Sequence, residues 1–539
     1  SELHMRLPTE VKLVSIEFPP HDVVSDDPLQ GYTIYRLKQP LAAHASMDFD
    51  FSLEYASRGF RNDPGDDHSV VDNGTFFNNL MFPHFGYDNE GQLTDRNDRR
   101  RYGLGPAARV AKIDDLPARA FNLLAKDADW VTFETTVSTV PDQIALAPGY
   151  LEKEWTENGR RYFHYKMDKP ILDFFSFQSA RYAVKKDLWN DVALEVYYDP
   201  QHPYNVDRMM DAMKKSLALF SKSYAPFQFR QMRILEFPGY ERFAQSFANT
   251  VPFSEAIGFI ADLRNPDDID YVFYVTAHEL AHQWWAHQVI GANVQGGTML
   301  DETFAQYSAL MVQEHEYGPE QMRRFLKYEL DRYLTGRSSE VVEEMPLALV
   351  ENQPYIHYRK GSVVMYALKD YLGEDVVDRT LARYDREMAF QQPPYTTTRD
   401  FLADLREEAG AQWSPLIDDL FDKITIYDNR VTDAISKKRA DGKYDVTLTV
   451  HAQKVHVDGV GKEAPAVLDQ PIDIGVFARA DDGKEAHEKV LLLEKHAIHD
   501  GDNTITVTVD GEPYEAGIDP YNKLVDRVSD DNRKRIGLQ

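Results

Sequence analysis

Two histidines and a glutamate are spaced as the ligands and the base of a metal-dependent hydrolase would be. His278, Glu279 and His282 form the pattern His-Glu-x-x-His. Residues four apart on a helix lie on the same face, so the two imidazoles can converge on one zinc ion. Glu279 would then face the open position of the metal as a general base. With 17 His in 539 residues, chance would produce this pattern about 0.03 times, so the spacing predicts a zinc site.

The third protein ligand must be a histidine or a carboxylate, because the chain contains no cysteine. A second helix, expected from about residue 298 to Gly318, carries the adjacent acids Asp301 and Glu302 in its first turn. Successive helical residues point about 100° apart, so only one of the two acids can face the metal. Spacing alone does not decide whether Asp301 or Glu302 is the third ligand. His and carboxylate ligands also discriminate poorly between zinc and other divalent ions.

Helical periodicity surrounds these residues. Apolar residues recur at helical spacing from Val206 to about Tyr427, interrupted by an expected strand at 232–237 and a second candidate strand at 254–262. The segment that carries both histidines starts with acidic residues near 267 and is expected to end near Gly291. The middle of the chain is therefore predicted to be mainly α with a small sheet.

Period-two patterns flank this helical region. Alternation at 47–55 predicts a half-buried strand, and similar runs continue to about residue 198. Period two returns at 444–450, 472–476 and 505–509. We therefore predict a multidomain α+β protein, with an N-terminal all-β domain (1–200), a catalytic domain (201–430) and a C-terminal β-sandwich (431–539).

Composition narrows the function classes. The net charge is −28 and 43% of residues are hydrophobic, which fits a well-packed globular protein and disfavours nucleic acid as a partner. No stretch of about 18 apolar residues marks a transmembrane segment. We expect a soluble domain, cytoplasmic or periplasmic. The start, Ser1 to Met5, resembles a cloning scar or a cut end, which raises the expectation of a longer parent chain.

The motifs together resemble the zinc aminopeptidases of the aminopeptidase N and leukotriene hydrolase family, a group of gluzincins. That family carries His-Glu-x-x-His, a gap of 18 residues and then Glu within a Leu-Asn-Glu-Gly-Phe-Ala-like segment. Residues 300–305, Leu-Asp-Glu-Thr-Phe-Ala, are similar to that segment and favour Glu302 as the ligand. The gap here is 19 residues, and Asp301 would restore 18. An extra residue in the loop 291–297 would explain the difference.

The resemblance implies two further site residues. The family binds the substrate's free amine with the Glu of a Gly-x-Met-Glu-Asn segment. Here Glu255 and Gly258 keep only part of that pattern, so Glu255 is the expected amine ligand. The family's oxyanion donor is the Tyr of a Tyr-x-Lys-Gly segment, which places Tyr358 in that role.

The resemblance therefore implies a thermolysin-like catalytic domain and a metallo-aminopeptidase with one zinc ion, acting on peptides that have a free N-terminus. Related domains also occur fused to membrane transport permeases, so a membrane-anchored parent chain is expected. Two alternatives remain open. The decayed Gly-x-Met-Glu-Asn pattern suits an endopeptidase, and the shifted gap suits a catalytically silent zinc-containing binding or regulatory domain.

Overall fold

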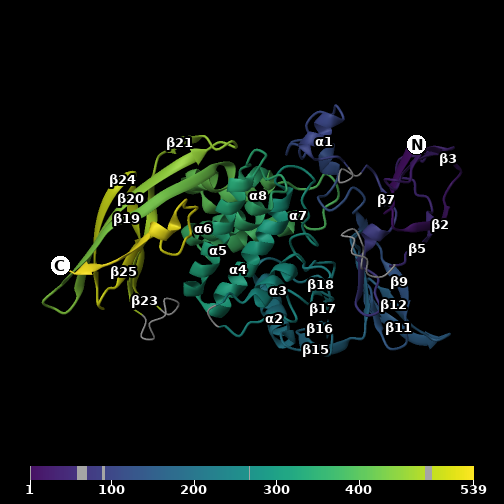
Figure 1. Ribbon diagram of the computed structural model, residues 1–539, viewed down its shortest axis with the longest axis horizontal. Helices are drawn as coiled ribbons and strands as arrows, with labels where there is room; N and C mark the ends of the chain where they lie inside the picture. Colours follow the sequence, from purple (N-terminus) through teal and green to yellow (C-terminus); the bar gives the residue numbers. More distant parts are fainter. Residues whose placement is uncertain (1, 58–68, 88–91, 266–267, 480–487, 539) are drawn as a thin grey trace.

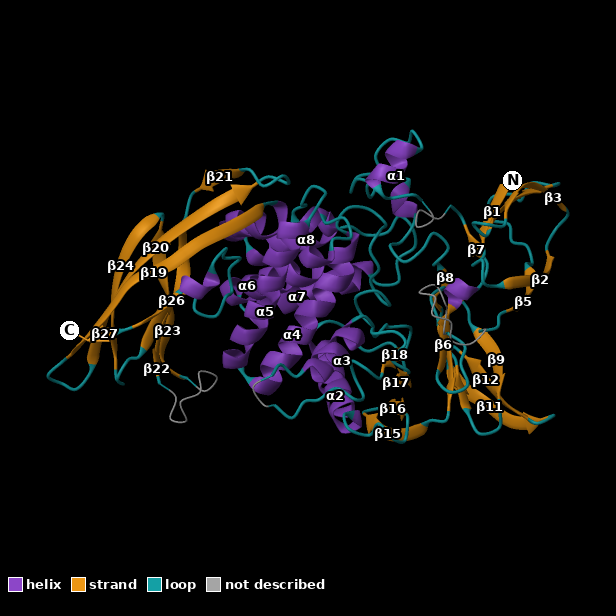
Figure 2. Ribbon diagram, in the orientation of Figure 1, coloured by secondary structure: helices purple, strands orange, loops and turns teal. Residues whose placement is uncertain are grey.

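The protein is elongated, with a helical centre between two β-rich ends (Figure 1). The computed structural model describes residues 2–57, 69–87, 92–265, 268–479 and 488–538. The N-terminus lies in one β-rich end and the C-terminus in the other. Strands and helices separate along the long axis (Figure 2). This order confirms the predicted multidomain α+β class.

The N-terminal end consists of small antiparallel sheets. The strand predicted at 47–55 is observed as β5 (Asp50–Glu54), which pairs with β2 (Lys12–Glu17). Across 47–55 the apolar side chains other than Phe51 are half-buried and the polar ones are exposed, as period two requires. The other elements of this end are β1 (Glu2–Arg6), β3 (His21–Asp27), β4 (Tyr32–Leu37), β6 (Thr75–Asn78), β7 (His84–Phe85), α1 (Arg96–Arg101), β8 (Trp130–Val131), β9 (Glu134–Thr139), β10 (Ile144–Leu146), β11 (Tyr150–Glu157), β12 (Arg160–Lys166), β13 (Ile171–Leu172) and β14 (Ser176–Ala180).

A four-stranded sheet leads into the helical centre. Its order is β15 (Ala183–Trp189), β16 (Val192–Tyr198), β17 (Gln231–Phe237) and β18 (Thr250–Ser254), and the last three strands are parallel. The strand predicted at 232–237 is β17. The candidate strand at 254–262 is not formed, because β18 ends at Ser254 and residues 255–260 are turns. Two of the strands precede residue 200, so the sheet spans the boundary that we predicted there.

The helices of the centre share the largest apolar core. Helix α2 (Val206–Ser223) buries Met209, Met213 and Leu217 at helical spacing, and it packs against α3 (Tyr271–Ala281) and α4 (Phe304–Tyr317). Within the described residues, every helix is too short or too polar to cross a lipid bilayer. The remaining helices are α5 (Pro319–Ser339), α6 (Gly361–Leu372), α7 (Glu374–Met388), α8 (Thr398–Ala409) and α9 (Ser414–Ile417).

The C-terminal end is the predicted pair of sheets. One sheet has the order β21-β20-β19-β27 with β24 also on β20, and the other has the order β23-β22-β25-β26. Apolar residues of β20 and β22 meet in one core, so the sheets pack face to face. The strands are β19 (Ile424–Lys438), β20 (Tyr444–Val457), β21 (Glu463–Ala466), β22 (Asp469–Ala478), β23 (Lys489–His499), β24 (Gly501–Val509), β25 (Glu515–Ile518), β26 (Arg533–Arg535) and β27 (Gly537–Leu538).

Candidate active site

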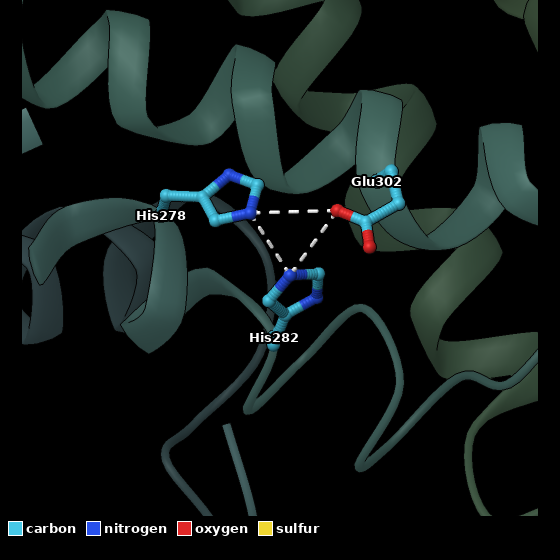
Figure 3. Close-up of side chains that lie close together, drawn as sticks. All are labelled: His278, His282 and Glu302. Atoms are coloured by element: carbon cyan, nitrogen blue, oxygen red, sulfur yellow. Dashed lines mark hydrogen bonds and ion pairs between the residues drawn. The ribbon is translucent and has the colours of Figure 1, made fainter. Parts of the chain in front are cut away.

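Helix α3 brings the two histidines of the His-Glu-x-x-His pattern together. Asp270 caps its N-terminus by accepting a hydrogen bond from the backbone N–H of Phe273. One turn apart at the other end, His278 and His282 turn their Nε2 atoms toward each other at 3.1 Å. Glu302 faces both rings from the start of the next helix (Figure 3). Its Oε2 atom lies 3.4 Å from Nε2 of His278 and 3.5 Å from Nε2 of His282.

This triangle of donor atoms fits a zinc ion. Zinc bound tetrahedrally at roughly 2.0–2.1 Å holds its ligand atoms about 3.3 Å apart, which lies within the three observed separations. The Oε2 atom of Glu302 is also buried and forms no hydrogen bond within the described part of the chain. A buried carboxylate oxygen without a donor is costly unless a cation accompanies it. The three side chains thus supply a chemically suitable donor set.

The structure separates the roles of the two adjacent acids. Met299–Thr303 form a π-helical turn that runs directly into α4. Within it, Asp301 Oδ1 lies 3.0 Å from Nδ1 of His282, and that nitrogen also lies 2.9 Å from the carbonyl oxygen of Trp285. With two acceptors beside it, Nδ1 carries the proton, and Nε2 keeps its lone pair for a metal. Glu302 therefore faces the metal position, while Asp301 orients His282.

Glu279 lies beside the ligands in a dry environment. Only 6% of its surface is exposed. Burial raises the pKa of Glu279 to about 7, although the nearby His282 opposes that shift. A carboxylate with this pKa can both take and return a proton near neutral pH.

Tyr358 reaches the site from a second π-helical turn, Tyr355–Lys360, which leads into α6. Its ring centroid lies 6.1 Å from that of His278. Burial raises the pKa of Tyr358 well above its ordinary value, and the negative charge of the neighbouring Glu302 carboxylate adds to this shift. The phenol therefore stays protonated and can donate a hydrogen bond.

A direct contact joins the two π-helical turns. The Oγ1 atom of Thr303 donates to the carbonyl oxygen of His357 at 2.6 Å. Gly361 allows this approach, because a Cβ atom there would lie 2.6 Å from Oγ1 and 2.7 Å from Cγ2 of Thr303. The glycine of the Tyr-x-Lys-Gly segment thus has a packing role beside the site.

Comparison with known proteins identifies the segment that carries this site. Residues 208–423 match the peptidase family M1 domain. We call this matched segment the M1 domain. Aminopeptidase M1-A of Oryza sativa subsp. japonica is 27% identical over 212 residues, which make up 37% of this chain and 23% of that protein. Endoplasmic reticulum aminopeptidase 2 of Homo sapiens is 22% identical over 208 residues, or 37% of this chain and 22% of that protein.

The M1 domain and its flanking parts also resemble a solved structure as a whole. The crystal structure of Legionella pneumophila aminopeptidase A in complex with aspartic acid superposes with a TM-score of 0.56 at 13% identity. It covers 100% of this chain, and this chain covers 55% of it. The likeness shows a shared fold. The chain spans about half the length of that structure, and the matched segments span less than a quarter of the two curated relatives named above.

Glu255, the expected amine ligand, lies at the wrong end of the sheet for that role. Gln283, directly after His282, accepts a hydrogen bond from the backbone N–H of Asn249, where β18 begins. Glu255 follows the last residue of β18. The five residues of β18, at about 3.3 Å each, place Glu255 roughly 16 Å along the strand from its start beside Asn249. The carboxylate instead contacts Gly239 and His202, so the sequence-based assignment of Glu255 needs correction.

The helix of the M1 domain that carries both histidines is also shorter than predicted. It ends at Ala281, with His282 as its C-cap, rather than near Gly291. Past this end, Gln283 donates to the Oγ atom of Ser246 at 2.7 Å and to the carbonyl oxygen of Phe247 at 2.8 Å. They hold this chain against the segment before β18, and the backbone leaves the helical path by Ala286, whose φ is 150°. A local helical pattern carries no signal for such long-range contacts.

Sequence reasoning missed the positioning residues of the M1 domain. Asp301 was considered only as an alternative ligand, although its place directly before Glu302 was a signal that both acids belong to the site. Thr303 gave no signal, because its contact with His357 joins turns 54 residues apart. Such a contact appears only once the two turns are packed.

Proposed function

We propose that this protein is a zinc-dependent aminopeptidase that hydrolyses the N-terminal residue from peptides. The observation that carries the proposal is the triangle of His278, His282 and Glu302 donor atoms with Glu279 and Tyr358 beside it. A purely structural zinc site would need neither a buried carboxylate of raised pKa nor a protonated phenol.

The side chains divide the work of peptide hydrolysis. A zinc ion held by the three ligands supplies Lewis-acid chemistry, polarising a carbonyl and making water easier to deprotonate near neutral pH. Glu279 takes the proton of the attacking water on its carboxylate and then passes it to the departing amine. Tyr358 donates a hydrogen bond to the substrate carbonyl oxygen as it gains negative charge.

The proposal that the enzyme cleaves at the N-terminal residue of its substrate rests on the names of the relatives. Several matched proteins are named aminopeptidases, and the donor set of His278, His282 and Glu302 in this chain supports extending that activity to it. A membrane-anchored parent chain stays a prediction.

An endopeptidase is the second candidate. The position of Glu255, roughly 16 Å along β18 from the end of the strand that contacts Gln283, favours it, because Glu255 was the expected anchor for a free substrate amine. Without such an anchor, the site would accept chains that extend in both directions.

A panel of fluorogenic aminoacyl amides, each with a free and an N-acetylated amine, separates these functions. We expect cleavage of the free-amine members only, with loss of activity in chelator and recovery on adding zinc. Cleavage of acetylated members would establish the endopeptidase. Zinc binding without any cleavage would support the catalytically silent domain.

A further inference from the structure

A second set of metal-ligating side chains converges at the carboxyl ends of the parallel strands β16, β17 and β18. His202 lies in the turn after β16, Glu236 lies near the end of β17, and Glu255 directly follows β18. We propose that His202, Glu236 and Glu255 bind a second divalent cation. This site is separate from the M1 zinc ligands and does not depend on the proposed peptidase activity.

The three donor atoms already face one another. Nδ1 of His202 lies 2.5 Å from Oε1 of Glu236 and 3.7 Å from Oε2 of Glu255. One atom from each residue falls within 4.8 Å of the other two. Among the described residues, only this group and the M1 ligands meet that condition. Small rotations would bring the donors to the roughly 3.3 Å separation of a zinc site.

Backbone amides orient both carboxylates. Oε2 of Glu236 accepts a hydrogen bond from the backbone N–H of Asp199 at 2.5 Å. Oε1 of Glu255 accepts one from the backbone N–H of Gly239 at 2.8 Å. In each case one oxygen is held by the main chain and the other is turned toward the imidazole. This is the outer support that protein metal ligands usually have.

The charge and space of the cluster suit a cation. Two carboxylates face one imidazole, and only 4% of Glu236 is exposed. Burial raises the pKa of Glu236 to about 7, which reflects the cost of its charge without a full counterion. A small cavity of about 30 Å³ beside Glu236 and Glu255 has room for one water molecule. Arg181 also lines this cavity, but its guanidinium pairs with Asp72 and Asp142.

The donor set indicates the class of ion. One imidazole nitrogen and two carboxylate oxygens suit zinc or another first-row transition ion, whereas calcium and magnesium prefer oxygen ligands only. The side chains of His202 and Glu255 are 25% and 28% exposed, so an ion can enter. Once bound, it would tie two strand ends to the turn that precedes α2. We infer a structural role for it, because Glu255 lies roughly 16 Å along β18 from the end of the strand that contacts Gln283.

Metal stoichiometry tests the proposal on the full chain. The protein is dialysed against a buffer of fixed free zinc, and zinc per chain is measured by mass spectrometry. We expect two ions in the wild type, and one in Glu255→Gln and in His202→Gln. His278→Ala should lose the other ion and keep one, whatever its peptidase activity. The matched control is Asp262→Asn, a surface acid paired with Arg264, which should keep two.

A thermal measurement gives a second readout. Zinc should raise the melting temperature of His278→Ala, and the additional change Glu255→Gln should abolish that rise. A ratio that neither Glu255→Gln nor His202→Gln lowers would overturn the second site. Circular dichroism checks that each variant is folded, and the two separate ligand variants keep the test decisive if one of them is not.

Discussion

Glu279 combines a fixed position with a pKa near neutrality, and its chemistry can be tested by a change of one atom. In Glu279→Gln the side chain keeps its size but loses the proton-accepting carboxylate. We expect turnover to fall by about 100-fold to 10,000-fold. The zinc content should stay the same, because the three ligands are unchanged. Steady-state kinetics and metal analysis on one preparation check both expectations, and a variant with near wild-type turnover would remove Glu279 from the mechanism.

Asp301 acts through His282, so its substitution should change metal affinity before it changes chemistry. Asp301→Ala removes the acceptor at 3.0 Å from Nδ1 of His282, and we expect zinc affinity to fall roughly 10-fold to 100-fold. Asp301→Asn keeps a carbonyl acceptor and should lose less. Competition with a chromophoric chelator measures both affinities, with Asp262→Ala as the surface control. Unchanged affinity in Asp301→Ala would show that Trp285 alone suffices to orient the ring.

At the scale of elements, the sequence predicted which helices carry the ligands but not how those helices begin and end. The apolar stripe and acidic start located α3, and the turn residues near Gly318 located the end of α4. The two π-helical turns, which carry Glu302 and Tyr358, were not predicted. Nothing in a local pattern marks them, since they form where α4 and α6 must pack against each other. The loop 291–297 was our explanation for the 19-residue gap between His282 and Glu302. The structure adds a second irregularity, because Glu302 itself lies in a π-helical turn.

The contact between these turns predicts an effect of a single methyl group. In Gly361→Ala the new Cβ would lie 2.6 Å from Oγ1 of Thr303, so one turn must move. We expect a loss of stability of about 1–3 kcal/mol and a fall in kcat, because the shift displaces Tyr358. Chemical denaturation and kinetics measure these effects. Thr303→Ala in the same chain should restore part of the stability.

Gly105 offers a matched control for this change. A Cβ atom at Gly105 would meet no described atom within 4 Å, so Gly105→Ala should leave both stability and kcat near the wild-type values. If Gly361→Ala behaved like Gly105→Ala, the close packing of the two π-helical turns would not matter to the site.

At the scale of the whole molecule, periodicity predicted the order of the three parts along the chain. It did not predict which strands pair across their boundaries. Period two indicated strands up to about residue 198, where β15 and β16 lie, yet it could not show that a sheet continues with β17 and β18 across residue 200. Strand pairing depends on contacts far apart in sequence, which one-dimensional patterns do not contain. The same reason explains Glu255, whose distance along the chain from His278 suited the site while its place on β18 did not.

The junction between the centre and the C-terminal end gives the last prediction. Asp370 of α6 and Asp473 of β22 share two lysines from the C-terminal end. Lys523 lies 2.5 Å from Asp370 and 2.7 Å from Asp473 and is only 11% exposed. Lys523→Met would leave the buried carboxylate of Asp473 and the half-buried carboxylate of Asp370 with Lys495 alone. Removing one partner from a buried ion pair costs about 3–5 kcal/mol, so we expect the denaturation midpoint to fall clearly.

A lysine in an exposed ion pair serves as the control for the effect of burial on this loss of stability. Lys443 pairs with Asp510 at 2.8 Å, but the two side chains are 49% and 83% exposed. Because water screens such a pair, Lys443→Met should cost at most about 1 kcal/mol. The two variants are compared by chemical denaturation of the full chain, with proteolysis to report separation of the C-terminal end. Equal midpoints would mean that the apolar contacts at this junction, rather than the buried charges, hold the C-terminal end against the M1 domain.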